Sequence, residues 1–558
     1  MEQLEGSVRM ELESAITRIA KHIGEQEKRI GSQLARIAEQ ERRIAILEEQ
    51  RRLDALARFA SKADRIPLLH PDHPDQLELL ALEPGLNESE LDGALDQPDD
   101  EKKADAPALE AIVKSVRYKK KTHAGRGAFP ARLRRVDILI DEPPPALPDG
   151  TLPRELRRDV TERLSFVPAE YYVERITTVS YAYPRQPASG VHRGAAPQSL
   201  VAKGLLAPSV VIEFLIAKYA DHQPVYRQVM ALSRDYGIDL SYATADRSVI
   251  DTAALTIHIA DAQLSELIAG DYIQADETRI QVMDLRVKGK TATGFLWCYS
   301  HPRGQVVYRY HSGRGGQYAL ADLDGFCGWL QSDGYQVYRT LARLFGVKVK
   351  HCACMAHVRR KFVEIVRANR GTAGFSAIVS TALALIALID ELYLIERELK
   401  DMNADAEQRQ VARAERSLLK FDDLMRAFNA AAIDENLLPG SALAKACAYA
   451  LRLRNELRRS FENGVTEIDN NRCEQSIRPI ALGRKNWLHV GSQEAAPAVA
   501  AIISVVESCK RMGINVRDYL GDVLPQLAAA HPDKVAALAK QLTPTEWLAA
   551  RKSLETAA

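Results

Sequence analysis

The stretch DYIQADETRIQVM, residues 271–283, is the first of several strand-like runs. TATGFLWCYS (291–300) and QVVYRYHSGR (305–314) follow it, and both are rich in aromatic and β-branched residues. A helical segment and two shorter strand-like runs come next: YALADLDGFCGW (318–329), LQSDGYQVY (330–338) and VKVKHCACM (347–355). The order strand, strand, strand, helix, strand, helix, strand predicts a mixed sheet flanked by helices.

Helical patterns lie on both sides of this region. After Val358 the chain is almost wholly helical to about Phe461, which predicts a helical insertion before the last elements of the sheet domain. Residues 205–260 also look helical, with a turn at Gly237 and Ser241 as an N-cap of the next helix. This pattern is typical of a DNA-binding helix-turn-helix, and a purely structural helical hairpin fits almost as well.

The N-terminal region repeats with a period of seven. Isoleucine occupies one core position five times, at residues 16, 23, 30, 37 and 44. The other core position holds Ile19, three glutamines and Leu47. We therefore expect a coiled coil that joins copies of the chain, in which the glutamines weaken the seam but could fix its register. The alternative is a single long surface helix.

Composition sets the broad class. A chain of 558 residues is too long for one core, and the formal net charge of +1 hides local blocks. Residues 114–135 carry nine Lys or Arg and no acid, as an arm along phosphates or a solvated linker would. Seven cysteines, a polar N-terminus without a signal peptide, and a most apolar run (380–400) interrupted by Asp390 and Glu391 predict a reduced, cytoplasmic protein without a membrane span.

Three acids are candidate metal ligands. Strand alternation places Asp276 on one face with Tyr272 and Gln274, and Glu277 on the other. Asp333 follows a short strand just before a glycine. Glu474 precedes a basic run that contains Arg478, Arg484 and Lys485. A lone Asp at a strand end is usually a turn residue, but three converging carboxylates can hold two divalent ions for phosphoryl transfer.

Four motifs carry a resemblance to a known family: YIQADET, LQSDGY, CMAHVRRKF and DNNRCEQSIRPIALGRKNWLHVGS (469–492). Together they resemble the transposases of the insertion sequence 66 family, from about residue 131 to residue 524. The resemblance implies an α/β, ribonuclease-H-like catalytic core of the DDE type with a large all-α insertion. It also implies a triad of Asp276, Asp333 and Glu474 that binds Mg²⁺ or Mn²⁺.

The same resemblance gives roles to other residues. The basic residues Arg359, Arg360, Arg478, Arg484 and Lys485 are expected to contact DNA or to support the triad. Trp487 either stacks on a base or, as we favour, packs the helix against the sheet.

His357 is expected to lie near the catalytic site. Because Cys352, Cys354 and His351 are close to it in sequence, a structural zinc site and plain packing are the alternatives. The paired cysteines common upstream in this family are missing, since the first cysteine is Cys298, so a zinc module there is degenerate or metal-free.

The expected organisation follows from these segments: a coiled coil (1–60), a linker with a basic arm (61–135), a degenerate zinc-binding-like β region (136–200), a helical DNA-binding region (201–265), the first part of the catalytic core (266–369), the helical insertion (370–462), the completion of the core (463–524) and a helical tail (525–558).

The expected function is transposition: cleavage at transposon ends and attack of the freed 3′-hydroxyl on target DNA. The alternatives are a catalytically silent DNA-binding regulator and a structure-specific nuclease. Transposon-end and target DNA, further copies of the chain and accessory proteins of the same element are the expected partners, in a nucleoid-associated location.

Overall fold

The computed structural model describes residues 2–59, 170–176, 180–182, 191–193, 199–201, 204–283, 290–369, 377–433 and 440–557. The expected basic arm and nearly all of the expected zinc-binding-like region lie outside these residues. Within that region, residues 170–176 form neither helix nor strand, although strand was expected there, and the short strands β1 (Ser180–Ala182) and β2 (Val191–Arg193) pair antiparallel. At the N-terminus, α1 (Glu2–Phe59) is one continuous helix of 58 residues.

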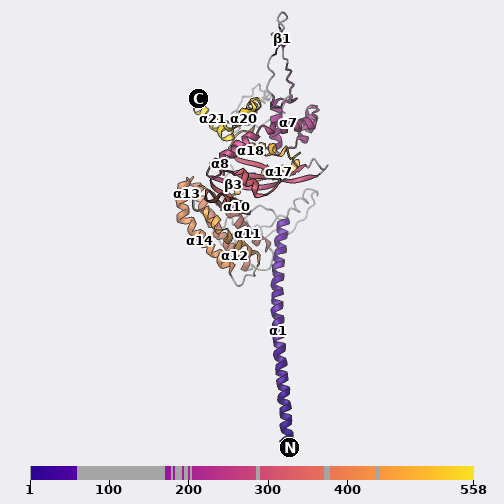
Figure 1. Ribbon diagram of the computed structural model, residues 1–558, viewed down its shortest axis with the longest axis vertical. Coiled ribbons are helices and arrows are strands. Elements are labelled where there is room, and N and C mark those ends of the chain that lie inside the picture. The colour runs from indigo at the N-terminus through magenta and orange to yellow at the C-terminus, as the bar shows by residue number, and fades with distance from the viewer. Residues whose placement is uncertain are drawn as a thin grey trace, which may run out of the picture. The chain divides into compact units, whose positions relative to one another are not determined.

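The other described strands form one five-stranded mixed sheet (Figure 1). Its strands are β3 (Tyr272–Met283), β4 (Thr291–Ser300), β5 (Val306–His311), β6 (Gly328–Ser332) and β7 (Val349–Ala353). The spatial order is β5-β4-β3-β6-β7, with β3, β4 and β5 antiparallel and β3, β6 and β7 parallel. Helix α9 (Gly316–Asp322) lies between β5 and β6 in sequence, and α10 (Gln336–Phe345) between β6 and β7. The predicted order of strands and helices is confirmed.

Helices cover both faces of the sheet. On one face α8 (Ile257–Ala269), α9 and α10 enclose an apolar core that includes Ile273, Ala275 and Trp297. On the other face α17 (Asn471–Trp487) packs on β3 and β4, while α18 (Ala496–Arg511) lies along β5 at the edge of the sheet and also contacts α8. Hydroxyls of α18 bond to the edge strand: Ser504 Oγ accepts from the Tyr308 amide and Ser508 Oγ from the Val306 amide. These bonds satisfy backbone groups at the edge of the sheet, which α18 covers.

The described residues between Met355 and Arg459 are almost wholly helical, as predicted. This segment contains α11 (Met355–Ala368), α12 (Ala377–Asp401), α13 (Ala406–Ala412), a π-helical turn (Arg413–Ser417), α14 (Leu418–Ala432), α15 (Ala442–Arg452) and α16 (Arg454–Arg459). Helices α11, α12, α14, α15 and α16 share one apolar core, in which Phe362 of α11 stacks on Phe428 of α14. Among the described residues, only α12 is long and apolar enough to span a membrane, and half of that stretch is buried within the bundle.

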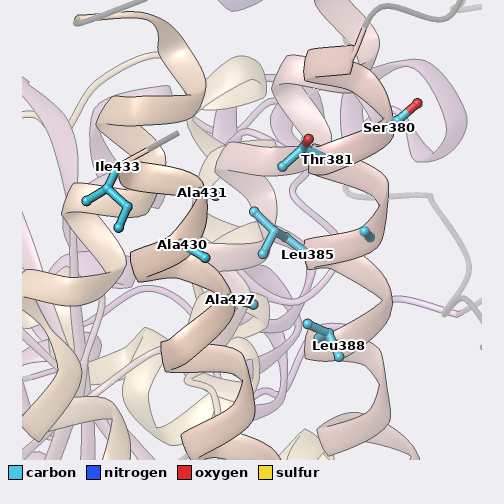
Figure 2. A pocket seen from close by; sticks show the side chains of 9 residues that line it. Ser380, Thr381, Leu385, Leu388, Ala427, Ala430, Ala431 and Ile433 are labelled. Atoms are coloured by element: carbon cyan, nitrogen blue, oxygen red, sulfur yellow. The ribbon is translucent and has the colours of Figure 1, made fainter. Parts of the chain in front are cut away.

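A hollow of about 670 Å³ lies between α12 and α14 (Figure 2). Its lining is apolar or small, with Leu385 and Leu388 facing Ala427 and Ala430. No side chain in this lining carries a charge, so the hollow offers no groups for phosphoryl chemistry. The candidate site therefore lies elsewhere, at the sheet.

Helices α5 (Pro208–Tyr219), α6 (Val225–Tyr236) and α7 (Tyr242–Ala254) precede α8. The predicted turn is confirmed: Gly237 ends α6 with φ of 65°, a conformation that favours glycine. Ser241 precedes α7, although its side chain makes no capping hydrogen bond. At the other end, α19 (Val516–Ala529), α20 (Pro532–Gln541) and α21 (Pro544–Ala557) follow α18. The expected boundary at residue 524 falls inside α19, where Leu527 is buried.

Candidate active site

Asp276 lies on β3, on the face that α17 covers. Its cross-strand neighbour on β4 is Cys298, so the two side chains share a face. The Cys298 sulfur lies 3.5 Å from the sulfur of Cys473 on α17. Glu277 points the other way, where its carboxylate accepts a hydrogen bond from Tyr338 of α10. The predicted alternation of these two acids is thus confirmed. Burial, with the nearby charges of Glu277, Asp333 and Glu474, raises the pKa of Asp276 well above its usual value.

Asp333 directly follows β6. Strands β3 and β6 are parallel neighbours, and Gln274 pairs with Gln331. Asp276 lies two residues after Gln274, and Asp333 lies two residues after Gln331. The register therefore brings Asp276 and Asp333 to one edge of the sheet.

The turn after β6 requires a glycine. Gly334 has φ of 85°, and a Cβ there would lie 3.1 Å from Leu453 Cδ1 and 3.3 Å from Tyr449 Oη. Asp333 Oδ1 accepts from the Tyr335 amide at 2.8 Å, and Tyr449 donates its hydroxyl to the Asp333 carbonyl. The turn is thus held by both the sheet domain and the helical insertion.

A buried polar network fixes the segment that leads into α17. Gln274 Nε2 donates to the Asp469 carbonyl at 2.8 Å, and Gln331 Nε2 donates to the Glu467 carbonyl at 2.8 Å. The Tyr272 hydroxyl joins the two glutamines and accepts from the Glu467 amide. Because buried polar groups need partners, these bonds fix where α17 begins relative to β3 and β6. Sequence reasoning placed Tyr272 and Gln274 on the correct face but missed this role.

Glu474 occupies the first turn of α17. Its Oε1 lies 3.5 Å from His357 Nδ1, and its Oε2 accepts from Arg360 Nη2 at 3.2 Å. Both Glu474 Oε1 and His357 Nδ1 are buried atoms without a hydrogen bond. Burial lowers the pKa of His357, while the Glu474 charge opposes that effect. The structure thus brings together Asp276, Asp333, Glu474 and His357, four residues drawn from β3, the end of β6, α17 and α11.

The donor set suits a hard divalent cation. The charges of Asp333 and Glu474 act on Asp276 and, with its burial, raise its pKa, so a bound cation would relieve this repulsion. Carboxylate oxygens are the ligands that Mg²⁺ prefers. Asp276, Asp333 and Glu474 are therefore the residues that could hold such a cation, and of the three only Glu474 belongs to the described group of ligand atoms within 4.8 Å of one another.

The four residues considered as zinc ligands, His351, Cys352, Cys354 and His357, do not lie together. Cys354 and His357 lie with Glu474, their ligand atoms within 4.8 Å of one another. His351 instead bonds to Ser332 at 2.9 Å, and burial raises the pKa of the Cys352 thiol to about 12. Neither residue belongs to the group around His357. A zinc site built from both cysteines and both histidines does not fit this arrangement.

The five basic candidates fall into different environments. Arg478 and Lys485 are exposed on α17. Arg484 is held against the sheet, where it donates to the Arg279 carbonyl at 2.7 Å. Arg360 pairs with Glu474, as described above. Arg359 is only 4% exposed and makes two bonds to buried Asp390, at 2.7 and 3.0 Å, so a DNA contact by Arg359 does not fit the structure.

Trp487 is half-buried and covers Gly483 one turn earlier in the same helix. A Cβ at Gly483 would lie only 2.7 Å from the indole nitrogen. The ring therefore packs closely on its own helix, and this contact tests neither the expected packing against the sheet nor base stacking.

A polar hollow of about 270 Å³ next to Glu277 was not predicted. Arg314 donates to Glu277 at 2.7 Å and lies over the Tyr335 ring at 4.2 Å. The hollow is lined by Glu277, Thr278, Arg279, Phe295, Arg314 and Arg484. Arg314 stands after β5 in sequence, and nothing in its local sequence marks it as a partner of Glu277.

Comparisons with known proteins identify the family of the chain. Residues 203–498 match the transposase IS66 family, which is more than half of the chain. The chain belongs to that family. It is also 30% identical over 421 residues to the uncharacterized protein y4qI of Sinorhizobium fredii, covering 73% of this chain and 75% of that protein. The uncharacterized protein y4hP of the same organism is 29% identical over 463 residues, covering 79% and 80% respectively.

Proposed function

We propose that this chain is a DNA transposase that cleaves the ends of an insertion sequence and joins them to target DNA. The observation that supports this most is the parallel register of β3 and β6, which brings Asp276 and Asp333 together opposite Glu474. The sheet order, with three antiparallel strands followed by two parallel ones, supports a ribonuclease-H-like core. The all-helical segment between β7 and α17 is then the insertion that precedes the third carboxylate.

In this proposal Asp276, Asp333 and Glu474 hold Mg²⁺ or Mn²⁺ through their carboxylate oxygens. The ions would stabilise the charge on the attacking and leaving oxygens of an in-line substitution at phosphorus. Cleavage adds water across a phosphodiester bond and leaves a free 3′-hydroxyl. In the second step that hydroxyl attacks a target phosphate, and a 3′-oxygen of the target leaves.

His357 and Arg360 act on the same site from α11. Arg360 orients Glu474, because it bonds to one carboxylate oxygen and leaves the other buried next to His357. His357, which is a quarter exposed, lies where it could contact a phosphate or a displaced base. The exposed Arg478 and Lys485 extend along α17 as phosphate contacts, in a helix with no acid after Glu474.

The chain would act on DNA in the cytoplasm, where the nucleoid lies, and assemble through α1. In this proposal the chain also interacts with accessory proteins of the same element. Helices α6 and α7 form a helix-turn-helix that binds DNA.

The test is a strand-transfer assay with duplexes that carry the two ends of the element encoding this chain. We expect the transferred strand, labelled at its 5′ end, to appear covalently joined to an unlabelled target plasmid in the presence of Mg²⁺. Cleavage without joined product would instead indicate a structure-specific nuclease. End binding without cleavage would indicate a DNA-binding regulator.

A further inference from the structure

Helix α1 exposes an apolar seam. The seam comprises Ile23, Ile30, Ile37 and Ile44 at one core position of the heptad and Gln26, Gln33, Gln40 and Leu47 at the other. Its four isoleucines are 50–55% exposed and Leu47 is 61% exposed. Such a continuous apolar row on a long helix is stabilised when another helix covers it.

The positions that flank the seam carry opposite charges on its two sides. The g positions of the heptad are His22, Arg29, Arg36 and Arg43, and the e positions are Glu27, Leu34, Glu41 and Glu48. Basic residues thus follow one edge of the seam and acidic residues follow the other. Residues at e and g determine which partner and which orientation a coiled coil adopts.

Only one orientation pairs these charges favourably. In a parallel pair, each g residue faces the e residue five positions later on the partner, which gives Arg36 with Glu41 and Arg43 with Glu48. In an antiparallel pair, g faces g and e faces e, so arginine would face arginine and glutamate would face glutamate. Like charges destabilise such contacts by about as much as opposite charges stabilise them.

The glutamines set the register. With the two helices level, each glutamine faces its own copy and Leu47 faces Leu47. A slip of one heptad would place Leu47 against Gln40, so an apolar side chain would face a polar one. A polar residue at a core position is a recognised means of fixing register, and β-branched residues at the isoleucine positions favour two strands.

We propose that α1 binds the α1 helix of a second copy of this chain in a parallel, in-register coiled coil. The two α1 helices then end at Phe59 on the same side of the assembly, and the chains that follow are held together there. The orientation follows from α1 alone. Its use, to hold two catalytic units on the two ends of one element, rests on the proposed function.

Disulfide trapping in the full-length protein tests the orientation. The background variant is Cys327→Ser, because Cys327 is exposed while the other six cysteines are buried. Gln26→Cys and Gln40→Cys are then made separately, with Glu39→Cys on the outer face of α1 as the matched control. We expect both glutamine variants to form covalent dimers with themselves on mild oxidation, and the control to form far fewer.

The alternatives give different results. In an antiparallel pair each glutamine position faces an isoleucine position, so Gln26→Cys would cross-link only when mixed with a variant such as Ile37→Cys or Ile44→Cys, and neither glutamine variant would cross-link with itself. A solitary helix would cross-link in no case, and either outcome overturns the proposal. These outcomes do not depend on catalysis, so failure of the proposed function would leave the result readable.

Charge reversal gives a second measurement. Arg36→Glu with Arg43→Glu turns four attractive contacts of a parallel dimer into repulsive ones, and we expect its dissociation constant to rise at least about ten-fold. Adding Glu41→Arg and Glu48→Arg should restore it. In an antiparallel pair Arg29 would face one of the new glutamates, so a dissociation constant that stays the same or falls would contradict the parallel arrangement.

Discussion

Replacing Arg359 by methionine tests whether this residue supports the helical insertion. The guanidinium makes two bonds to Asp390, and the two side chains are 5% and 0% exposed. Removing one partner of a buried ion pair leaves an uncompensated charge and costs about 3–5 kcal/mol. Two lost hydrogen bonds to a charged group, at about 1.5–3 kcal/mol each, give a similar figure. We expect Arg359→Met to lower the free energy of unfolding by about this amount.

Urea unfolding followed by circular dichroism measures the change, with Arg478→Met as the exposed control. The double variant Arg359→Met with Asp390→Leu should recover much of the loss, because neither charge then remains buried alone. The reasoning is refuted if Arg359→Met unfolds at the same urea concentration as the parent chain. It is also refuted if the variant is equally stable but binds DNA ends poorly, since Arg359 would then be a DNA contact.

Further predictions concern His357, His351 and α1. His357→Ala should slow single-turnover cleavage about ten- to a thousand-fold with little change in melting temperature; loss of bound zinc together with a lower melting temperature would instead identify a zinc site. Burial lowers the pKa of His351 to about 3. The folded state therefore resists protonation of this ring, which the unfolded state accepts below a pKa of about 6.5. The resulting part of the free energy of unfolding is fully present above that pH and is lost as pH falls toward 3, by up to about 1.4 kcal/mol per pH unit. His351→Gln should flatten that part of the stability curve, and an unchanged slope in urea titrations at pH 7, 6 and 5 would exclude the effect. Deleting residues 1–50 should reduce the number of chains per particle in light scattering, and an unchanged number would leave α1 a solitary helix.

Much of the sheet domain was predictable because its strands carry strong local signals. The aromatic and β-branched runs at 291–300 and 305–314 became β4 and β5, and alternation placed Asp276 and Glu277 on opposite faces. Gly237 likewise marked a turn through its own backbone freedom. In each case the information lies within a few neighbouring residues.

The pairings across long separations were not predictable. Arg359 lies 31 residues from Asp390, and Arg360 lies 114 residues from Glu474, so no local pattern joins them. One signal was present: Asp390 interrupts the most apolar run of the chain, and a buried carboxylate requires a cationic partner. Which of several arginines would fill that role depends on how α11 and α12 pack.

The most direct test of the central claim is the cleavage rate of Glu474→Gln in Mg²⁺. The amide keeps the shape of the side chain but loses the charge that would help to balance bound cations. We predict that the variant binds transposon-end duplexes with nearly parental affinity while single-turnover cleavage falls more than about a hundred-fold. Near-parental cleavage by Glu474→Gln would contradict the assignment of Asp276, Asp333 and Glu474 as the catalytic triad.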